Sequence, residues 1–168
     1  MYSTQGLKRG ANPADSAVAI STFPVGDVRN DPIGTVNKLI NWAFMGKKPR
    51  LLRRLIGLIF HIELPALLHP LRMAHPFGIV VNSGARLGRN VTIFQNVTIG
   101  SKRLGRNAGV AIVGDDVVIF PNAVIVGAVL IGGRAVIAPG AVVINDVPAG
   151  ATVAGNPARV IERKVNKS

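Results

Sequence analysis

Apolar residues recur every six positions from Val81 to Pro148, and this repeat restricts the fold more than any other feature of the chain. An aliphatic residue opens each hexad, a small or β-branched residue follows four positions later, and Gly, Asn or Asp usually stands between, which suits tight turns. The openers are Val81, Leu87, Ile93, Ile99, Val113, Ile119, Ile125, Ile131, Ile137 and Val143. The second positions are Ala85, Val91, Val97, Val117, Ala123, Val129, Ala135, Ala141 and Val147.

A hexad is too short to bury its own apolar face, so hexads must stack on one another. We interpret each hexad as a short strand and a turn, with three hexads closing one triangular coil of a parallel β-helix. A β-sandwich is a poor alternative, because its strands vary in length and alternate with period two. The predicted fold class is all-β, a parallel β-helix of hexapeptide repeats preceded by a short N-terminal α-helical segment.

The first third of the chain lacks the repeat. Asp31-Pro32 predicts a helix start, with Asp as the cap and Pro at the first helical position. Lys47-Lys48-Pro49 ends this helix, and a second helix is predicted from Arg50 to Phe60. The Pro- and Gly-rich stretch after Asn145 predicts that the coils stop near Val147. We therefore expect an irregular arm over 1–30, a helical cap segment over 31–60, the β-helix domain over 61–150 and a C-terminal tail over 151–168.

The formal net charge is +12, and half of this excess lies in residues 1–60. Nucleic acid is a poor partner, since aromatic content is low and a β-helix offers no element that reads a groove. An anionic cofactor or an anionic membrane surface explains the charge better. Residues 31–60 thus have two interpretations: a cap over the open end of the β-helix or at a subunit interface, or a basic amphipathic segment on a membrane with Trp42 and Phe44 at the interface.

Three observations bear on location. The chain has no cysteine, which fits a reduced compartment. Met1 to Arg29 contains no apolar run of the kind found in a signal peptide. The longest apolar run, Leu55 to Phe60, is too short to span a bilayer. We expect a cytoplasmic protein, with peripheral contact at the inner face of the membrane left open.

The repeat is interrupted first around His75. Met73 and Val81 are eight positions apart, so two residues are extra. Interruptions of a rigid scaffold are where function is expected. Of the other histidines, His61 ends an apolar run and His69 falls at a turn, so His75 is the best general base. The chain shows no P-loop, zinc spacing or Ser-His-Asp order, and direct transfer with a histidine base is the economical mechanism.

The second interruption follows Ile99. This residue and Val113 are 14 positions apart, which leaves eight extra residues. The inserted stretch, Ser101 to Ala111, contains Lys102, Arg103, Arg106 and Asn107 and no acidic residue. It therefore predicts a basic surface loop.

Three stretches resemble the serine acetyltransferase-like hexapeptide-repeat acyltransferases: His75 to Asn82, Val91 to Gly100, and Ala154 to Val160. The resemblance covers roughly residues 62–162. It implies a left-handed parallel β-helix, a homotrimer, and acetyl-CoA bound between neighbouring subunits as the acyl donor, with no metal. It implies that His75 removes the proton of an acceptor hydroxyl as the oxygen attacks the thioester carbonyl. A carboxylate orients the base in such enzymes, and Glu63 is the candidate here, with a capping or solvated role as its alternative.

The resemblance also implies binding residues. For acetyl-CoA these are Gly100, Ser101, Pro121, Pro139, Thr152 and Arg159. Arg159, with Arg163 or Lys164, would meet the phosphates of the cofactor, a charge-assisted role that suits arginine. For the acceptor they are Asn82, Arg103 and Arg106. The plainer interpretations are that the two prolines are corner residues and that Arg159 is a solvated charge.

Three departures from the family bear on the acceptor. Serine acetyltransferases resembling this chain have a long helical N-terminal domain, whereas about 60 residues precede the repeat here. They carry a second histidine in the loop, where this chain has Asn107-Ala108-Gly109-Val110. They often end in an Ile tail, whereas this chain ends Asn166-Lys167-Ser168. Each departure weakens serine as the acceptor. The His-x-x-Gly-x-x-x-Asn bulge from His75 to Asn82 also resembles that of short acetyltransferases of exopolysaccharide or capsule assembly, and this resemblance implies an O-acetyltransferase acting on a sugar of polysaccharide or exopolysaccharide biosynthesis.

Other functions remain open. Serine O-acetylation in cysteine biosynthesis is the first alternative, because Arg103 or Arg106 can hold a serine carboxylate. A non-catalytic β-helix scaffold is the second. A carbonic anhydrase of the same fold needs three zinc-binding histidines, and His61, His69 and His75 are poorly placed for that.

Overall fold

The computed structural model describes residues 32–45 and 49–161, in which two helices precede a series of very short strands. Some predictions made from the sequence concern residues outside these ranges, namely those for residues 1–30, Asp31, Lys47-Lys48, Arg163 and Lys164. The elements are α2 (Pro32–Phe44), α3 (Arg50–Phe60), β1 (Arg72–Met73), β2 (Val80–Val81), β3 (Arg86–Leu87), β4 (Thr92–Ile93), β5 (Thr98–Gly100), β6 (Ile112–Val113), β7 (Val118–Ile119), β8 (Val124–Val126), β9 (Leu130–Ile131), β10 (Val136–Ile137), β11 (Val142–Val143), β12 (Thr152–Ala154) and β13 (Arg159–Val160).

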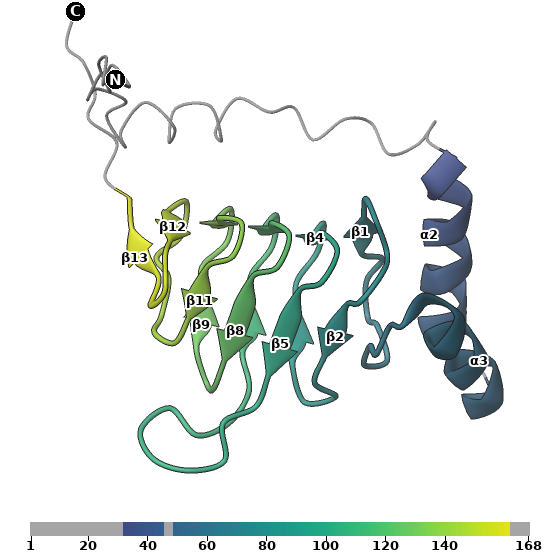
Figure 1. Cartoon of the computed structure of the whole chain (residues 1–168), viewed down its shortest axis with the longest axis horizontal. Helices are drawn as coiled ribbons and strands as arrows, with labels where there is room; N and C mark the ends of the chain where they lie inside the picture. Colours follow the sequence, from purple (N-terminus) through teal and green to yellow (C-terminus); the bar gives the residue numbers. More distant parts are fainter. Residues whose placement is uncertain (1–31, 46–48, 162–168) are drawn as a thin grey trace, which may run out of the picture.

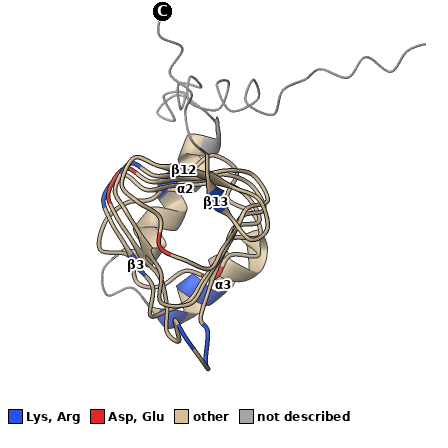
Figure 2. Cartoon of the chain, turned by 90° about the vertical axis from the view of Figure 1, so that its left-hand side faces the viewer, with Lys and Arg blue, Asp and Glu red and all other residues tan. Residues whose placement is uncertain are grey.

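From β1 to β11, every third strand along the chain joins the same sheet, which confirms the parallel β-helix (Figure 1). Sheet 1 has the order β1-β4-β7-β10-β12-β13, sheet 2 the order β11-β8-β5-β2, and sheet 3 the order β3-β6-β9. All these pairings are parallel except that of β12 with β13. Viewed along the axis, the coils superimpose as one prism (Figure 2). We call the corner between sheets 1 and 2 the first corner, that between sheets 2 and 3 the second, and that between sheets 3 and 1 the third.

The hexad openers form three apolar columns inside the prism. Side chains of successive coils stand directly above one another, because the parallel pairing brings each opener into register with the next. Those of Ile93, Ile99, Ile119, Ile125, Ile131 and Ile137 are fully buried. Burial of a side chain of this size stabilises the fold by about 2–3 kcal/mol relative to exposure. The second positions of the hexads are small because they lie beside the corners, where the chain turns sharply.

The corners require a left-handed backbone, which explains the Asn, Asp and Gly between the apolar positions. Asn90, Asn96, Asp116 and Asn122 all have positive φ. At the third corner, a Cβ on Gly132 would collide with the backbone of Ala149 in the next coil, so glycine is needed there for close stacking. The hexad pattern therefore encodes turns as well as strands.

Helix α2 closes the open end of the β-helix. Ile40, Ala43 and Phe44 are buried against the first coil. The buried side chain of Asn41 imitates a neighbouring strand: its Oδ1 accepts the backbone N–H of Leu71 at 2.8 Å, and its Nδ2 donates to the Leu71 carbonyl oxygen at 2.8 Å. The backbone N–H and C=O of Leu71, at the edge of the first coil, therefore find hydrogen-bond partners in the Asn41 side chain.

Helix α3 is placed differently, although it has the bounds that the sequence predicts. Ile56 is its buried residue, while the apolar side chains Leu51, Leu55, Leu58 and Ile59 are exposed. Helix α2 is therefore the cap. The expectation that Phe44 lies at a membrane interface is wrong, because this side chain is buried against the first coil, whereas Trp42 is exposed and α3 leaves an apolar face uncovered in this chain. Neither helix, nor any other in the described ranges, has the length and apolar character needed to cross a membrane.

The expectation that the coils stop near Val147 is wrong. Strand β12 pairs in parallel with β10, so the ladder continues to Ala154. Val147 lies in register with Ile131, an opener, and not in the column of second positions. The physical reason is a corner two residues shorter than the others, since only four positions separate Val143 from Val147 where six separate Ile125 from Ile131. Thr152, expected in a C-terminal tail, belongs to sheet 1.

Replacing the capping side chain tests the closure of the first coil. We expect Asn41→Ala to lower the free energy of unfolding by about 2–4 kcal/mol, because it leaves the buried N–H and C=O of Leu71 without partners. Urea denaturation followed by circular dichroism measures this. Asn145→Ala, at an exposed position, is the control and should change stability by less than about 0.5 kcal/mol. Equal stabilities of the two variants would contradict the role given to Asn41.

Candidate active site and substrate-binding loop

His75 and Pro76 are the two residues that the first corner has in excess. The backbone N–H groups of Asn96, Asn122 and Gly140 donate to the carbonyl oxygens of Phe77, Gln95 and Pro121, respectively. Phe77, Gln95, Pro121 and Pro139 are therefore equivalent positions on successive coils. The extra residues lie just before Phe77, so the interruption counted in the sequence is a bulge that lifts His75 out of the regular corner.

The bulge is held on both sides. Within it, the Phe77 N–H donates to the His75 carbonyl oxygen at 2.8 Å, and Pro76 is buried. The Phe77 ring packs on Phe60, the last residue of α3, with ring centroids 5.6 Å apart. Gly78 has a positive φ, and a Cβ there would collide with Oδ1 of Asn96. The His75 side chain is exposed on this fixed support, so the imidazole is available to a substrate.

Glu63 reaches the same sheet from the segment that follows α3. Its N–H donates to the Ile79 carbonyl oxygen at 2.9 Å, and its carbonyl oxygen accepts the Val81 N–H at 2.7 Å. Glu63 therefore extends sheet 2 by one residue beyond β2, and its carboxylate is exposed. Within residues 32–45 and 49–161, no hydrogen bond or ion pair joins this carboxylate to His75. Glu63 as the orienting group thus remains a proposal.

The inserted loop, Ser101 to Ala111, leaves the β-helix at the second corner and runs along the later coils (Figure 1). Lys102 and Gly109 pair as the base of a hairpin, and Nζ of Lys102 donates to the Arg106 carbonyl oxygen at 2.8 Å. Asn107 anchors the tip: its carbonyl oxygen accepts the Ala128 N–H, and its Nδ2 donates to the Ile144 carbonyl oxygen. Arg103 and Arg106 are exposed, and the loop projects from the prism as a basic element (Figure 2).

The residues predicted to bind the acceptor gather at the second corner. The Asn82 N–H donates to the Ile99 carbonyl oxygen, and its Oδ1 accepts the Gly84 N–H at 2.9 Å, so the side chain also builds the local turn. Asn82 shares this corner with the loop that carries Arg103 and Arg106. His75 lies at the first corner. One chain therefore does not bring the predicted base and the predicted acceptor-binding arginines to the same corner.

The residues predicted to bind acetyl-CoA are spread over three places. Gly100, which ends β5 with open space beside it, and the exposed Ser101 lie at the second corner. Pro121 and Pro139 follow His75 down the first corner. Thr152 and Arg159 lie at the C-terminal end, on the paired strands β12 and β13, where Arg159 is in register with Ala154 and borders a hollow of about 210 Å³.

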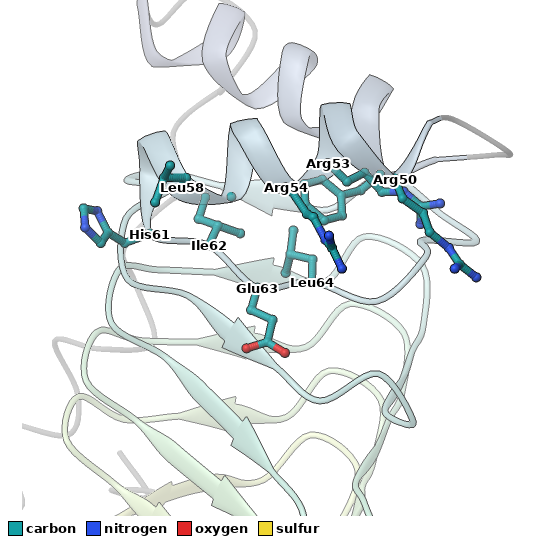
Figure 3. Close-up of a pocket in the computed structure, with 10 residues that line it drawn as sticks. Arg50, Arg53, Arg54, Leu58, His61, Ile62, Glu63 and Leu64 are labelled. Atoms are coloured by element: carbon teal, nitrogen blue, oxygen red, sulfur yellow. The ribbon is translucent and has the colours of Figure 1, made fainter.

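A larger cavity, of about 490 Å³, lies between α3 and the segment that leads into the first coil (Figure 3). Arg50, Arg53, Arg54, Leu58 and His61 line it from the helix side, and Ile62, Glu63 and Leu64 from the coil side. This cavity was not predicted from the sequence. The available signal was the group of three arginines in a helix without an acidic residue.

No group of three or more His, Cys, Asp or Glu side chains gathers as a metal site among the residues that the structure describes.

The loop anchor can be tested by proteolysis. We expect Asn107→Ala to increase tryptic cleavage at Arg103 and Arg106 about tenfold, because it removes a hydrogen bond and places alanine at positive φ. Limited digestion followed by mass spectrometry measures the rate. Asn122→Ala, which makes the same exchange at a positive-φ corner away from the loop, is the control. Similar cleavage of both variants would show that Asn107 does not hold the loop.

Comparison with known proteins identifies relatives of the chain. No family model matches it. A curated serine acetyltransferase of Staphylococcus xylosus is 32% identical over an alignment of 140 residues, and the alignment covers 77% of this chain and 65% of that protein. The chain thus spans slightly less than two thirds of the length of this relative.

Solved structures show the same relationship. The serine acetyltransferase of Neisseria gonorrhoeae superimposes with a TM-score of 0.59 and 32% identity, over 69% of this chain and 46% of that chain. Its complex with serine gives a TM-score of 0.54 and 34% identity, over 64% and 45%. The serine acetyltransferase of Brucella abortus strain S19 in complex with coenzyme A gives 0.55 and 26%, over 77% and 54%. Sequence and structure together show that this chain is similar to the serine acetyltransferases and shares the left-handed parallel β-helix of their hexapeptide-repeat family.

Proposed function

We propose that the protein is an acetyl-CoA-dependent O-acetyltransferase with His75 as its general base. The observation that carries the proposal is the bulge at the first corner. A rigid ladder has two extra residues there, and they hold an imidazole exposed on a fixed support. The relatives named serine acetyltransferase supply the class of reaction.

The mechanism needs one proton carrier and no covalent enzyme intermediate. The neutral imidazole of His75 accepts the proton of the acceptor hydroxyl as the oxygen attacks the thioester carbonyl carbon of acetyl-CoA. The C–S bond then breaks, and the departing thiolate takes the proton from the imidazolium. The products are an acetyl ester and free CoA. Glu63, on the neighbouring segment, would orient the imidazole after a side-chain movement.

Acetyl-CoA is the donor that the relatives support, since the Brucella abortus enzyme was solved with coenzyme A. The chain offers cationic and main-chain groups that fit it. Arg159, exposed beside the hollow at the C-terminal end, suits a phosphate group. Gly100, Ser101, Pro121, Pro139 and Thr152 would contact the pantetheine arm.

A sugar hydroxyl of a polysaccharide or exopolysaccharide precursor is the acceptor that we favour. The inserted loop contains no histidine that could contact an acceptor. Its tip residue, Asn107, instead holds the loop against the next coils. L-serine is the second candidate. It is favoured by the names of the relatives and by the serine complex of the Neisseria gonorrhoeae enzyme. In either case Asn82, Arg103 and Arg106 would hold the acceptor.

A homotrimer would complete the site. His75 and the basic loop lie at different corners of one prism, so the loop of a neighbouring copy is needed to bring an arginine to the base. The faces beside the second corner carry exposed apolar side chains of the kind found in interfaces: Val80 on sheet 2, and Ile112 and Leu130 on sheet 3. These faces would form the contact between subunits.

We place the protein in the cytoplasm, at the inner face of the membrane. Of the residues 31–60 for which membrane contact was expected, α3 carries the basic, apolar surface that supports contact with an anionic lipid surface. A non-catalytic scaffold with the same fold would not explain why the corner bulges at a histidine.

Substitution of the base tests the catalytic proposal. We expect His75→Ala to reduce thiol release from acetyl-CoA at least about 100-fold, because the acceptor hydroxyl loses its proton acceptor. The circular dichroism spectrum and the oligomeric state should not change. His69→Ala, at a partly buried turn before β1, is the matched control and should keep its activity. A His75→Ala enzyme with full activity would refute the mechanism, and calorimetry showing no CoA binding by the unsubstituted protein would favour the scaffold.

The same thiol assay separates the acceptors. Nucleotide sugars and short glycans are compared with L-serine at equal concentration. Faster release with a glycan supports the favoured acceptor, and faster release with L-serine replaces it by the second candidate.

The subunit contact is testable separately. We expect the double substitution of Ile112→Asp and Leu130→Asp to convert the trimer into monomers, since it places charges on the apolar faces. Light scattering coupled to gel filtration measures the mass. Activity should fall with the trimer if the loop of one copy serves the base of another. A monomeric unsubstituted protein with full activity would disprove the shared site.

A further inference from the structure

The cavity under α3 is strongly cationic. Arg50, Arg53 and Arg54 line it, and Glu63 is its acidic lining residue. Residues 32–60 contain six Lys or Arg and no Asp or Glu, so the helices supply no negative charge to this end of the molecule. In Figure 3, Arg50 and Arg54 project from α3 on the side of the first coil, while the Glu63 carboxylate points away from the helix. Such an arrangement suits a phosphate group.

An exposed apolar stripe borders this cavity. Leu51, Leu55, Leu58 and Ile59 are 68%, 50%, 73% and 65% exposed. Their spacing of four, seven and eight positions places them on one face of α3. Arg50 and Arg54 follow along one edge of this face, and Leu58 belongs both to the stripe and to the cavity lining. A ligand that fits both features carries an anionic group joined to hydrocarbon.

We propose that this surface docks on an anionic membrane, with the phosphate group of a lipid headgroup in the cavity and the leucine stripe among the acyl chains next to it. Trp42 on α2 is also exposed at the end of the molecule that carries the two helices. A helix with a cationic edge and an apolar face is the form that peripheral proteins present to lipid interfaces.

Charge argues against a second copy of this chain as the occupant. Self-association through the stripe would bring Arg50 and Arg54 of two copies close together. Residues 32–60 offer no acidic side chain and the Glu63 carboxylate points away from α3 (Figure 3), so the helices of a second copy would not compensate these charges. An anionic lipid surface neutralises them instead.

The docking surface also bears on the acceptor. Phe60, which ends α3, packs on Phe77, two positions after His75. A membrane held by α3 would therefore lie near the base, so the acceptor would be a hydroxyl of a lipid-attached glycan. This consequence depends on the proposed acetyl transfer, whereas membrane docking does not.

Vesicle flotation of the full chain tests the docking. The test compares phosphatidylcholine vesicles with vesicles that also contain roughly one third phosphatidylglycerol, both at about 0.1 M salt. The protein should bind only the anionic vesicles. The variant with Arg50→Gln and Arg54→Gln should bind about 10- to 30-fold more weakly, the factor expected for two cationic side chains near an anionic surface.

The matched control is Arg89→Gln with Arg134→Gln, which removes the same charge from exposed positions at the third corner. This variant should lose less than about threefold in binding, because its arginines lie away from α3. Leu55→Gln with Leu58→Gln should also weaken binding, and circular dichroism should show that every variant is folded. Binding by His75→Ala should equal that of the unsubstituted protein, which separates docking from catalysis.

Three results would overturn the proposal. One is no binding of the unsubstituted protein to anionic vesicles. Another is an equal loss for the two arginine pairs, which would indicate a response to net charge alone. The third is a larger assembly that dissociates in the leucine variant while vesicle binding stays unchanged, since a second copy of the chain would then cover the stripe.

Discussion

The stacking of one coil on the next is the interaction on which this structure depends. Each coil contributes one aliphatic side chain per sheet to a buried column, and the same contact pairs its backbone with both neighbouring coils. A single coil has neither an interior nor a closed set of hydrogen bonds, so the fold gains stability only through repetition. Small second positions and left-handed corners follow from the same constraint, because they allow the turns to stack closely.

Stacking also creates two open ends of the β-helix, and different elements close them. Near the N-terminus, the Asn41 side chain pairs with Leu71 and α2 buries its apolar residues on the first coil. At the other end, β13 folds back antiparallel to β12 and stops the ladder. Helix α3 buries Ile56 and packs Leu52 and Phe60 partly against the core, which leaves a stripe and a cationic cavity for another partner. Of the basic residues in the first third of the chain, Lys38, Arg50, Arg53 and Arg54 are described, and the three arginines line this cavity.

Functional groups occupy the positions where stacking tolerates a change in length. A corner can lengthen without disturbing the columns, because the strands on either side keep their register. His75 is presented on a two-residue bulge, and the basic loop is an insertion whose tip rests on later coils. The scaffold fixes where these groups begin and end. It places them at separate corners, which is why we assign the complete site to more than one subunit.

The sequence alone determined the β-helix, the bounds of α3 and the two lengthened corners, because a six-residue period, a helical apolar period and a count of positions are all local properties. The sequence pattern assigned Val147 to the second position of a hexad, four residues after the opener Val143. In the structure Val147 is itself an opener, because the corner before it is two residues shorter than the others. The folded structure was needed to find the pairing of Asn41 with Leu71, the separation of His75 from the arginines of the loop, and the cavity under α3. Each of these joins segments distant in the sequence, and their relative position follows from packing that no local pattern records.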